Sequence, residues 1–102
     1  MGNRTNNTNV SGGNWSENEK RSVWNKGVTI QSLDAATWRK DKCGKKIKWD
    51  DHGNRDSEFG WEIDHIQPVS KNGSDELSNL QPLHWENNAD KADSTDWKCP
   101  AK

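Results

Sequence analysis

An aspartate is followed directly by a histidine, Asp64 and His65, at the end of a run in which apolar and polar residues alternate. Such alternation is typical of a strand, whose neighbouring side chains point to opposite faces. A metal ion held by Asp64 and a base provided by His65 would therefore approach one bound group from different directions. In-line hydrolysis of a phosphodiester needs a base for the attacking water and positive charge at the leaving oxygen. The pair predicts metal-assisted hydrolysis, with a histidine that is largely neutral near pH 7.

Polar side chains downstream of this pair would complete a metal site. His84 and Asn88 are four residues apart, so on a helix they share one face and can converge on one ion with Asp64. A carboxylate and an amide oxygen favour Mg²⁺ or Mn²⁺, and the imidazole of His84 would extend the choice to Ni²⁺, Co²⁺ or Zn²⁺. His84 would otherwise cap the start of the helix or pack on Trp85. Asn79 would hold either the neighbouring loop or the ring of His65 through its amide.

Two strands and a helix are predicted to carry these residues. The alternating run 60–66 indicates a half-buried strand that ends before Pro68, because proline cannot continue a strand ladder. Turn-forming residues at 71–75 indicate a loop, and the apolar anchors of 77–83 indicate a second short strand. An acidic residue early and a basic residue late suit a short helix over 84–93.

The whole chain has 102 residues, 27% of them hydrophobic, which limits it to one small domain. Its seven tryptophans and its net charge of -1 argue against a disordered chain, and the tryptophans are interpreted mainly as core. Composition divides the chain into a disordered tail, a lead-in segment with a basic hairpin region, the core of the predicted site, and a C-terminal tail. These parts span residues 1–14, 15–59, 60–93 and 94–102.

The chain carries neither the run of about 18 apolar residues that a membrane-spanning helix needs nor the apolar region of a secretory signal. These features predict a cytoplasmic protein that does not bind a membrane. Cytosolic thiols are usually reduced, so Cys43 and Cys99 are interpreted as free thiols, with a disulfide between them as the alternative. A mixed zinc site is less favoured because close pair spacings are missing. Its ligands would be Cys43, His52, His84 and Cys99.

One stretch of the chain is strongly basic. Residues 39–48 hold six lysines or arginines and one aspartate, and they lie between Trp38 and Trp49. Clustered cations beside aromatic residues are the electrostatic footprint of a protein that binds a phosphate backbone. A solvated, lysine-rich hairpin strand is the alternative. The predicted DNA contacts are Arg39, Lys40, Lys42, Lys45, Lys46 and Lys48, with Lys91 on the helix as a further candidate that would otherwise satisfy helix carbonyls.

A resemblance to the HNH endonuclease family covers residues 60–91, GWEIDHIQPVSKNGSDELSNLQPLHWENNADK. It rests on several spaced elements at once, which are Asp64-His65-Ile66 with Pro68, the Gly73-Ser74-Asp75 loop, Asn79-Leu80, and Asn88 followed by Lys91. A weaker likeness extends upstream through residues 39–44 to 53–55. The resemblance implies an α+β fold with a ββα-metal core, also called a His-Me finger, preceded by a basic N-terminal extension.

The resemblance also implies a role for each residue of the predicted site. His65 would be the general base, and Asn79 would position it. Asp64 and Asn88 would be metal ligands, and His84 would be a further ligand, as in colicin-type nucleases.

The chain departs from the family pattern at the structural zinc that two CxxC pairs bind in many members. Cys43 is followed three residues later by Lys46, and His84 and Asn87 stand in place of the second pair. This zinc site is therefore predicted to be absent. Extra tryptophans or a link between Cys43 and Cys99 would have to stabilise the domain instead.

Together these features predict a metal-dependent endonuclease that hydrolyses DNA phosphodiesters with one divalent ion and low sequence specificity. Products with 5′-phosphate and 3′-hydroxyl ends are implied by the resemblance. A monomer with one such site would nick DNA, and cutting of both strands would need a dimer or a second event. Two other classes stay open: a non-catalytic nucleic-acid-binding module, and a structural domain with a tryptophan-rich interface.

Overall fold

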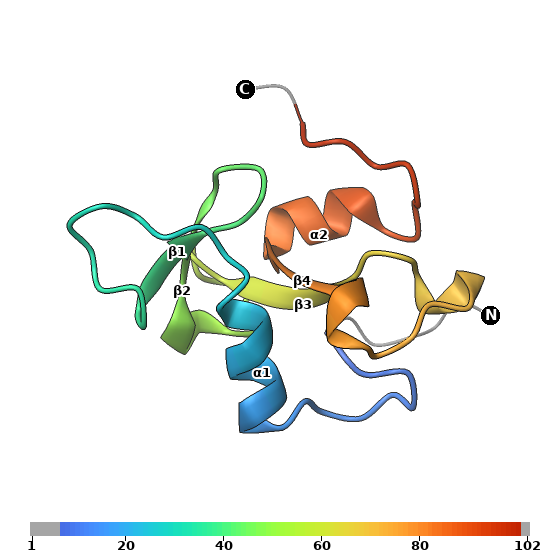
Figure 1. The fold of residues 1–102 in the computed structure, drawn as a ribbon. Coiled ribbons are helices and arrows are strands. Elements are labelled where there is room, and N and C mark those ends of the chain that lie inside the picture. The colour runs from blue at the N-terminus through green and yellow to red at the C-terminus, as the bar shows by residue number, and fades with distance from the viewer. Residues whose placement is uncertain (1–6, 101–102) are drawn as a thin grey trace.

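Two hairpins and two helices make up the α+β fold of residues 7–100, the part of the chain that the computed structural model describes. The elements are α1 (Glu17–Trp24), β1 (Trp38–Lys40), β2 (Lys46–Lys48), β3 (Trp61–His65), β4 (Leu80–His84) and α2 (Trp85–Lys91). β1 pairs with β2 and β3 pairs with β4, both antiparallel. The two helices lie on opposite faces of the β3–β4 hairpin (Figure 1). No helix in the described part of the chain is long and apolar enough to cross a membrane.

Tryptophans form much of the core between α1 and the second hairpin. Trp24 on α1 is fully buried and lies against Trp61 on β3, with ring centroids 5.0 Å apart. Burial of a large apolar side chain contributes about 1.5–3 kcal/mol to stability, so this small core depends on a few residues. The buried apolar residues of the cluster are Trp15, Val23, Trp24, Ile47, Trp61, Ile63 and Leu80.

The lead-in segment contains α1. The sequence feature that marks this helix is the capping residue at its start, not a regular spacing of apolar residues. The Ser16 side chain accepts from the Glu19 backbone N–H over 3.1 Å, and the Glu19 carboxylate accepts from the Ser16 backbone N–H over 2.8 Å. This capping box satisfies two backbone donors at the helix start. Only Val23 and Trp24 of the helix are buried, so periodicity alone does not reveal it.

The predicted order of strand, long loop, strand and helix is confirmed. β3 lies within the predicted run 60–66, and α2 lies within 84–93. β4 begins at Leu80 rather than at 77, because residues 77–79 form a turn of 3-10 helix. Trp61 pairs with His84 and Asp64 pairs with Gln81 in the register of this hairpin.

Residues 7–14 belong to the tail that composition predicts to be disordered, and Asn7 in this part contacts the rest of the fold; the first six residues lie outside the described residues. The Asn7 side-chain oxygen accepts from the backbone N–H of Ile63 over 2.7 Å. Trp15 Nε1 donates to the backbone oxygen of Asn7 over 3.1 Å. Hydrogen bonds of this kind attach a polar segment that has little apolar surface of its own.

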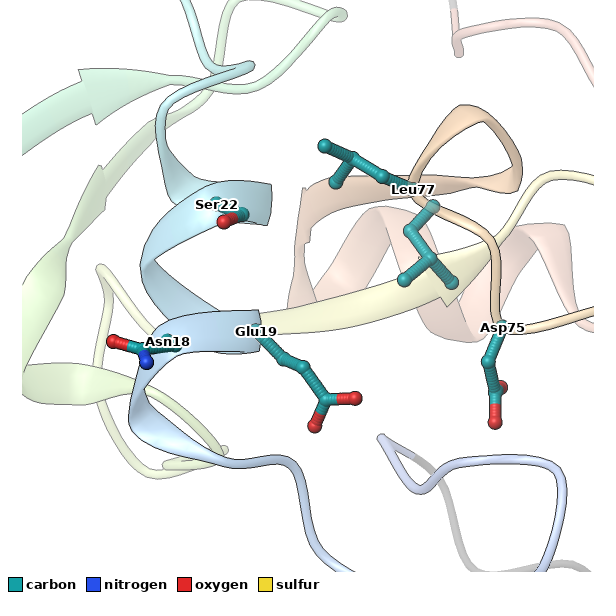
Figure 2. A pocket seen from close by; sticks show the side chains of 6 residues that line it. Asn18, Glu19, Ser22, Asp75 and Leu77 are labelled. Atoms are coloured by element: carbon teal, nitrogen blue, oxygen red, sulfur yellow. The ribbon is translucent and has the colours of Figure 1, made fainter.

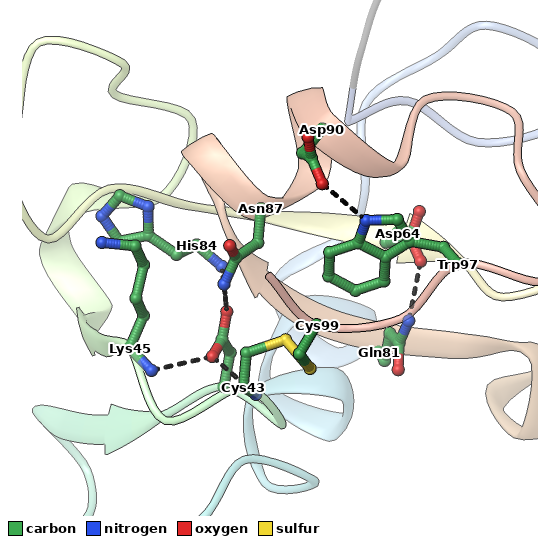
Figure 3. Close-up of a disulfide and its surroundings, with 10 residues drawn as sticks. Cys43, Lys45, Asp64, Gln81, His84, Asn87, Asp90, Trp97 and Cys99 are labelled. Atoms are coloured by element: carbon green, nitrogen blue, oxygen red, sulfur yellow. Dashed lines mark hydrogen bonds between the residues drawn. A yellow bond between two sulfur atoms is a disulfide. The ribbon is translucent and has the colours of Figure 1, made fainter. Parts of the chain in front are cut away.

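The two cysteines form a disulfide, which corrects the prediction of free thiols. Cys43 lies in the turn of the first hairpin, and Cys99 follows it by 56 residues with a Cα–Cα distance of 5.4 Å (Figure 3). Trp97 Nε1 donates to the Asp90 carboxylate of α2 over 2.8 Å, which draws the C-terminal segment across α2 towards Cys43. The prediction of free thiols rested on the reducing conditions of the cytosol, whereas the pairing depends on how close the fold brings the two cysteines. A cross-link of this span contributes about 2–4 kcal/mol.

The burial of His52 predicts acid sensitivity of the fold. Its ring lies 4.7 Å from the Trp61 ring, and Nε2 is 3.1 Å from Asn7 Oδ1. Burial first, and then the charge of Lys20, lowers the pKa of His52 to about 4. Below about pH 6.5 the unfolded chain binds a proton that the folded chain excludes, so this contribution is complete above pH 6.5 and is lost as the pH falls towards 4.

We expect the free energy of unfolding to fall by up to about 3 kcal/mol across that pH window because of His52. His52→Gln keeps a donor for Asn7 but does not titrate, so its stability should change less with pH. Urea unfolding of both proteins between pH 4 and 7 checks this. Parallel pH curves for the wild type and His52→Gln would refute it.

Candidate active site

β3 places the predicted metal ligand Asp64 and the predicted base His65 on opposite faces, as the alternation predicts. Asp64 contacts Lys91 on α2. His65 packs on the other side against Trp15, with ring centroids 5.7 Å apart. Asp64 is 6% exposed and His65 is 7% exposed, so neighbouring protein groups surround both side chains.

The Asp64 carboxylate has two protein partners. Gln81 Nε2 donates to Oδ2 over 2.8 Å, and Lys91 Nζ lies 3.2 Å from Oδ1. Burial raises the pKa of the Asp64 carboxyl above its usual range, and the bonds from Gln81 and Lys91 oppose this rise only in part. The contacts from Gln81 and Lys91 therefore offset only part of the cost of burying the charged carboxylate, and a bound cation would stabilise it further.

Lys91, predicted as a DNA contact or as a partner of helix carbonyls, makes internal contacts between α2 and β3. Its side chain is only 4% exposed, and Nζ donates to the backbone oxygen of His65 over 3.0 Å besides contacting Asp64. A buried ammonium with two such partners is not free to reach a phosphate in solvent. Lys91 therefore fixes α2 to the end of β3.

Glu62 connects a loop arginine to the predicted metal ligand Asn88. Its carboxylate is 3% exposed and accepts from Arg55 Nε over 2.7 Å and from Arg55 Nη2 over 2.8 Å. The same carboxylate accepts from Asn88 Nδ2 over 2.7 Å. Because a carboxylate only accepts, this contact sets which end of the Asn88 amide faces Glu62.

The donor chemistry on the α2 side of β3 fits a divalent ion held partly by substrate. Asp64 offers a carboxylate, and Asn88 offers an amide oxygen to which no described residue donates. No group of three or more His, Cys, Asp or Glu side chains within residues 7–100 is arranged to hold a metal ion. Mg²⁺ commonly keeps several waters and binds one or two carboxylates plus substrate phosphates. Two protein oxygens therefore suit an ion shared with substrate.

Asp75 orients the ring of His65, a role that sequence reasoning missed. Asp75 Oδ1 lies 2.8 Å from His65 Nε2, and the backbone N–H of Val10 donates to both Asp75 oxygens over 3.1 Å. Since the carboxylate only accepts, Nε2 carries the hydrogen in the neutral ring, and Nδ1 keeps a lone pair for a proton. Asp75 lies ten residues downstream in a loop, so no local pattern relates it to His65.

A pocket of about 230 Å³ opens beside Asp75, between α1 and the loop that leads to β4 (Figure 2). The carboxylates of Glu19 and Asp75 line it, so it disfavours a phosphate group. Its lining residues are Asn18, Glu19, Ser22, Asp75, Leu77 and Leu80.

Asn79 holds the loop after β3, the first of the two roles that its amide predicts. Its Oδ1 accepts from the backbone N–H of Gln67 over 2.8 Å. Its Nδ2 donates to the backbone oxygens of Gln67, over 3.1 Å, and Ser74, over 2.8 Å. Asn79 therefore closes the loop that carries Asp75, the residue whose carboxylate contacts the His65 ring.

His84 caps α2, and the structure does not support its predicted role as a metal ligand. Nδ1 accepts from the backbone N–H of Glu86 over 3.0 Å, and Nε2 lies 2.7 Å from the Glu58 backbone oxygen. Both ring nitrogens are therefore engaged. The register also places His84 opposite Trp61, at the far end of the hairpin from the row that holds Asp64.

The positions of the second CxxC pair belong to a hydrogen-bonded cluster around Asp41. This carboxylate is 1% exposed, and its Oδ2 accepts from the His84 backbone N–H and from Asn87 Nδ2, each over 2.9 Å (Figure 3). Its Oδ1 accepts from the backbone N–H groups of Cys43, over 3.0 Å, and Lys45, over 2.9 Å. With Cys43 oxidised and the His84 ring engaged, the mixed zinc site is also excluded.

The first hairpin presents a basic and aromatic outer face, made of Trp38, Lys40, Lys46 and Lys48. Lys46 and Lys48 each lie 5.5 Å from the Trp38 ring centroid, and Phe59 packs edge-on against that ring at 5.1 Å. Trp38 pairs with Lys48 and Lys40 pairs with Lys46, so these four side chains share one face of the hairpin.

The other predicted DNA contacts are placed differently. Arg39 shares the inward face of the hairpin with Ile47 and donates to the backbone oxygens of Ala35, Asn25 and Gly27, so its guanidinium has a structural role. Lys45 lies 3.2 Å from the Glu86 carboxylate, and Lys42 lies 5.9 Å from the Trp97 ring centroid.

The family model described as HNH endonuclease matches residues 41–94, which is more than half of the 102-residue chain. The match contains β3, β4 and α2, and with them Glu62, Asp64, His65, Asp75 and Asn88. Trp38 and Lys40 of the hairpin face lie before the matched residues. No curated protein and no solved structure matches the chain.

Proposed function

The chain belongs to the HNH endonuclease family, and on this basis we propose that it is a metal-dependent endonuclease that hydrolyses DNA phosphodiesters. In this proposal β3, β4 and α2 form the ββα-metal core. The observation that carries it is the divergence of Asp64 and His65 from the end of β3, with the ring of His65 fixed by Asp75. A module that only binds nucleic acid has no need of an oriented histidine.

Asp64 and Asn88 would hold the divalent ion, which supplies positive charge to the scissile phosphate and to the leaving 3′ oxygen when bound. Because His84 is engaged elsewhere, the remaining protein donors are oxygens. Oxygen donors favour Mg²⁺ or Mn²⁺ and remove the reason for expecting Ni²⁺, Co²⁺ or Zn²⁺.

His65 would act as the general base through Nδ1, which takes a proton from the attacking water. The contact between Nε2 and Asp75 holds the ring in one tautomer and stabilises the imidazolium that forms, a division of labour that other histidine bases share. The activated water attacks phosphorus, the bond from phosphorus to the 3′ oxygen breaks, and that oxygen takes a proton from solvent. The ends left are 5′-phosphate and 3′-hydroxyl.

DNA would be held mainly through its phosphates by the outer face of the first hairpin. Lys40 and Lys46 are exposed there, and Lys48 and Trp38 are partly buried beside them. Contacts to phosphates position a protein without reading bases, which supports nicking with low sequence specificity. Lys42 and Lys45 also lie at the surface and would extend this contact area.

Conversion of supercoiled plasmid to nicked circles tests the proposal. The wild type should nick the plasmid at low salt with Mg²⁺ or Mn²⁺, and nicking should stop in excess chelator. The alternative, a non-catalytic nucleic-acid-binding module, is supported by the lack of a group of three or more His, Cys, Asp or Glu ligands within residues 7–100. That alternative predicts retarded DNA in a gel with every ion, and nicks with none.

Replacing Lys46 and Lys48 together with alanine should weaken DNA binding because both ammonium groups lie on the outer face of the hairpin. Each lost phosphate contact removes about 0.9 from the slope of log affinity against log salt concentration, so the double variant should lower the slope by about 2. Lys98→Ala, at an exposed site in the C-terminal segment, is the matched control. Fluorescence anisotropy with a labelled duplex measures both; equal slopes for the two variants would contradict the assignment.

A further inference from the structure

Glu62 is buried between three elements of the fold. It projects from β3, receives Arg55 from the loop before β3, and receives Asn88 from α2. We propose that Glu62, held by Arg55, is a positioning residue that turns the amide oxygen of Asn88 towards the divalent ion. This inference rests on the proposed function, because it assumes that Asn88 is a metal ligand.

The two ends of an asparagine amide have nearly the same size but opposite chemistry. The oxygen accepts and can bind a cation, whereas the NH₂ group only donates and would repel one. Packing alone does not distinguish these two ends, so a hydrogen bond must do so. Glu62 Oε1 lies 2.7 Å from Asn88 Nδ2, and a carboxylate accepts only from the nitrogen. Asn88 Oδ1 then faces away from Glu62, and no described residue donates to it.

Arg55 makes this arrangement stable. A carboxylate that is 3% exposed needs a partner charge, and Arg55 supplies it through two parallel bonds of 2.7 and 2.8 Å. The bidentate contact fixes the plane of the carboxylate, so Oε1 meets Asn88 at a defined angle. Both oxygens of Glu62 are thereby engaged, which makes Glu62 a support for the ligand rather than a ligand.

Mn²⁺ titration followed by electron paramagnetic resonance of the free ion tests the inference without relying on cleavage. Glu62→Gln presents an amide that lets Asn88 rotate, so Mn²⁺ affinity should fall 10- to 100-fold, the usual cost of losing a partner that orients a metal ligand. Glu86→Gln is the matched control, because it removes an exposed carboxylate from the same helix that carries Asn88. Its Mn²⁺ affinity should equal that of the wild type.

A reciprocal exchange gives the sharper test. Asn88→Asp alone places two carboxylates in contact and should also bind Mn²⁺ weakly. In the double variant Glu62→Gln/Asn88→Asp, the amide NH₂ introduced at position 62 would donate to the carboxylate introduced at position 88, whose other oxygen would face the ion. The double variant has the same total charge as the wild type. It can therefore serve as a folded protein for this test if Glu62→Gln alone unfolds.

We expect the double variant to recover Mn²⁺ affinity to within about threefold of the wild type. The effects of the two substitutions would then not add, as is usual for residues in direct contact. Unchanged affinity in Glu62→Gln would overturn the inference and leave the proposed function intact. Additive losses in the double variant would overturn it as well. A wild type that binds no Mn²⁺ in the presence of DNA would overturn the proposed function together with the inference.

Discussion

Replacing His65 with alanine should slow metal-dependent DNA cleavage by about 10²- to 10⁴-fold, the usual contribution of a general base. DNA binding and metal binding should persist, because the hairpin lysines and Asp64 are separate from the imidazole. Single-turnover cleavage of a labelled duplex, with a gel shift on the same samples, measures both. A variant that keeps a third or more of the wild-type rate would contradict the assignment.

Two further variants separate chemistry from packing at His65. His65→Gln keeps most of the volume beside Trp15 and a donor for Asp75, so it should remain folded and still lack the base. Asp75→Asn keeps the base but loses the carboxylate that orients it, so its loss of rate should be smaller than that of His65→Ala.

Replacing Asp41 with alanine should lower the free energy of unfolding by at least about 3 kcal/mol, because each buried donor left without a partner costs about 1–3 kcal/mol. Four donors depend on this carboxylate, which is 1% exposed. Guanidinium unfolding with the disulfide intact measures the change. The control is Asp50→Ala, at an exposed site in the turn after β2, which should change stability by less than about 0.5 kcal/mol. A change of under about 1 kcal/mol in Asp41→Ala would refute the prediction.

The Asp41 cluster and the disulfide lie where the zinc-binding pairs of the family pattern would stand, and they connect the first hairpin to α2 and to the C-terminal segment. Asp41 joins the end of the first hairpin's β1 to the start of α2 through His84 and Asn87. The link between Cys43 and Cys99 joins the turn of the same hairpin to the C-terminal segment. Zinc-binding pairs at these positions would connect the hairpin turn to the start of the helix as well.

Much of the second hairpin is predictable because its signals are local. The alternation around Asp64 and His65 sets both the strand and the divergence of the two side chains. Glycine, asparagine and serine mark the loop, and the residues after Pro82 suit a helix start. Each signal acts over a few residues, so one sequence suffices to read it.

Contacts between distant residues could not be predicted in this way. Asp41 and His84 meet across 43 residues, and Asn7 and Ile63 meet across 56. The same limit applies to Lys91, whose spacing places it on α2 but does not say whether its ammonium points inward. Glu62 could have been identified from the sequence, since it lies two residues before Asp64 and alternation places both side chains on the same face of the strand.

Resealing of the nicks by DNA ligase tests the central claim, hydrolysis of DNA phosphodiesters with departure of the 3′ oxygen, most directly. Supercoiled plasmid is nicked by the wild type in Mg²⁺, freed of protein, and incubated with ligase and no other enzyme. We expect metal-dependent nicks that close completely, because hydrolysis at this site leaves 5′-phosphate and 3′-hydroxyl ends. Nicks that ligase cannot close, or bound plasmid that stays supercoiled with every ion, would contradict it.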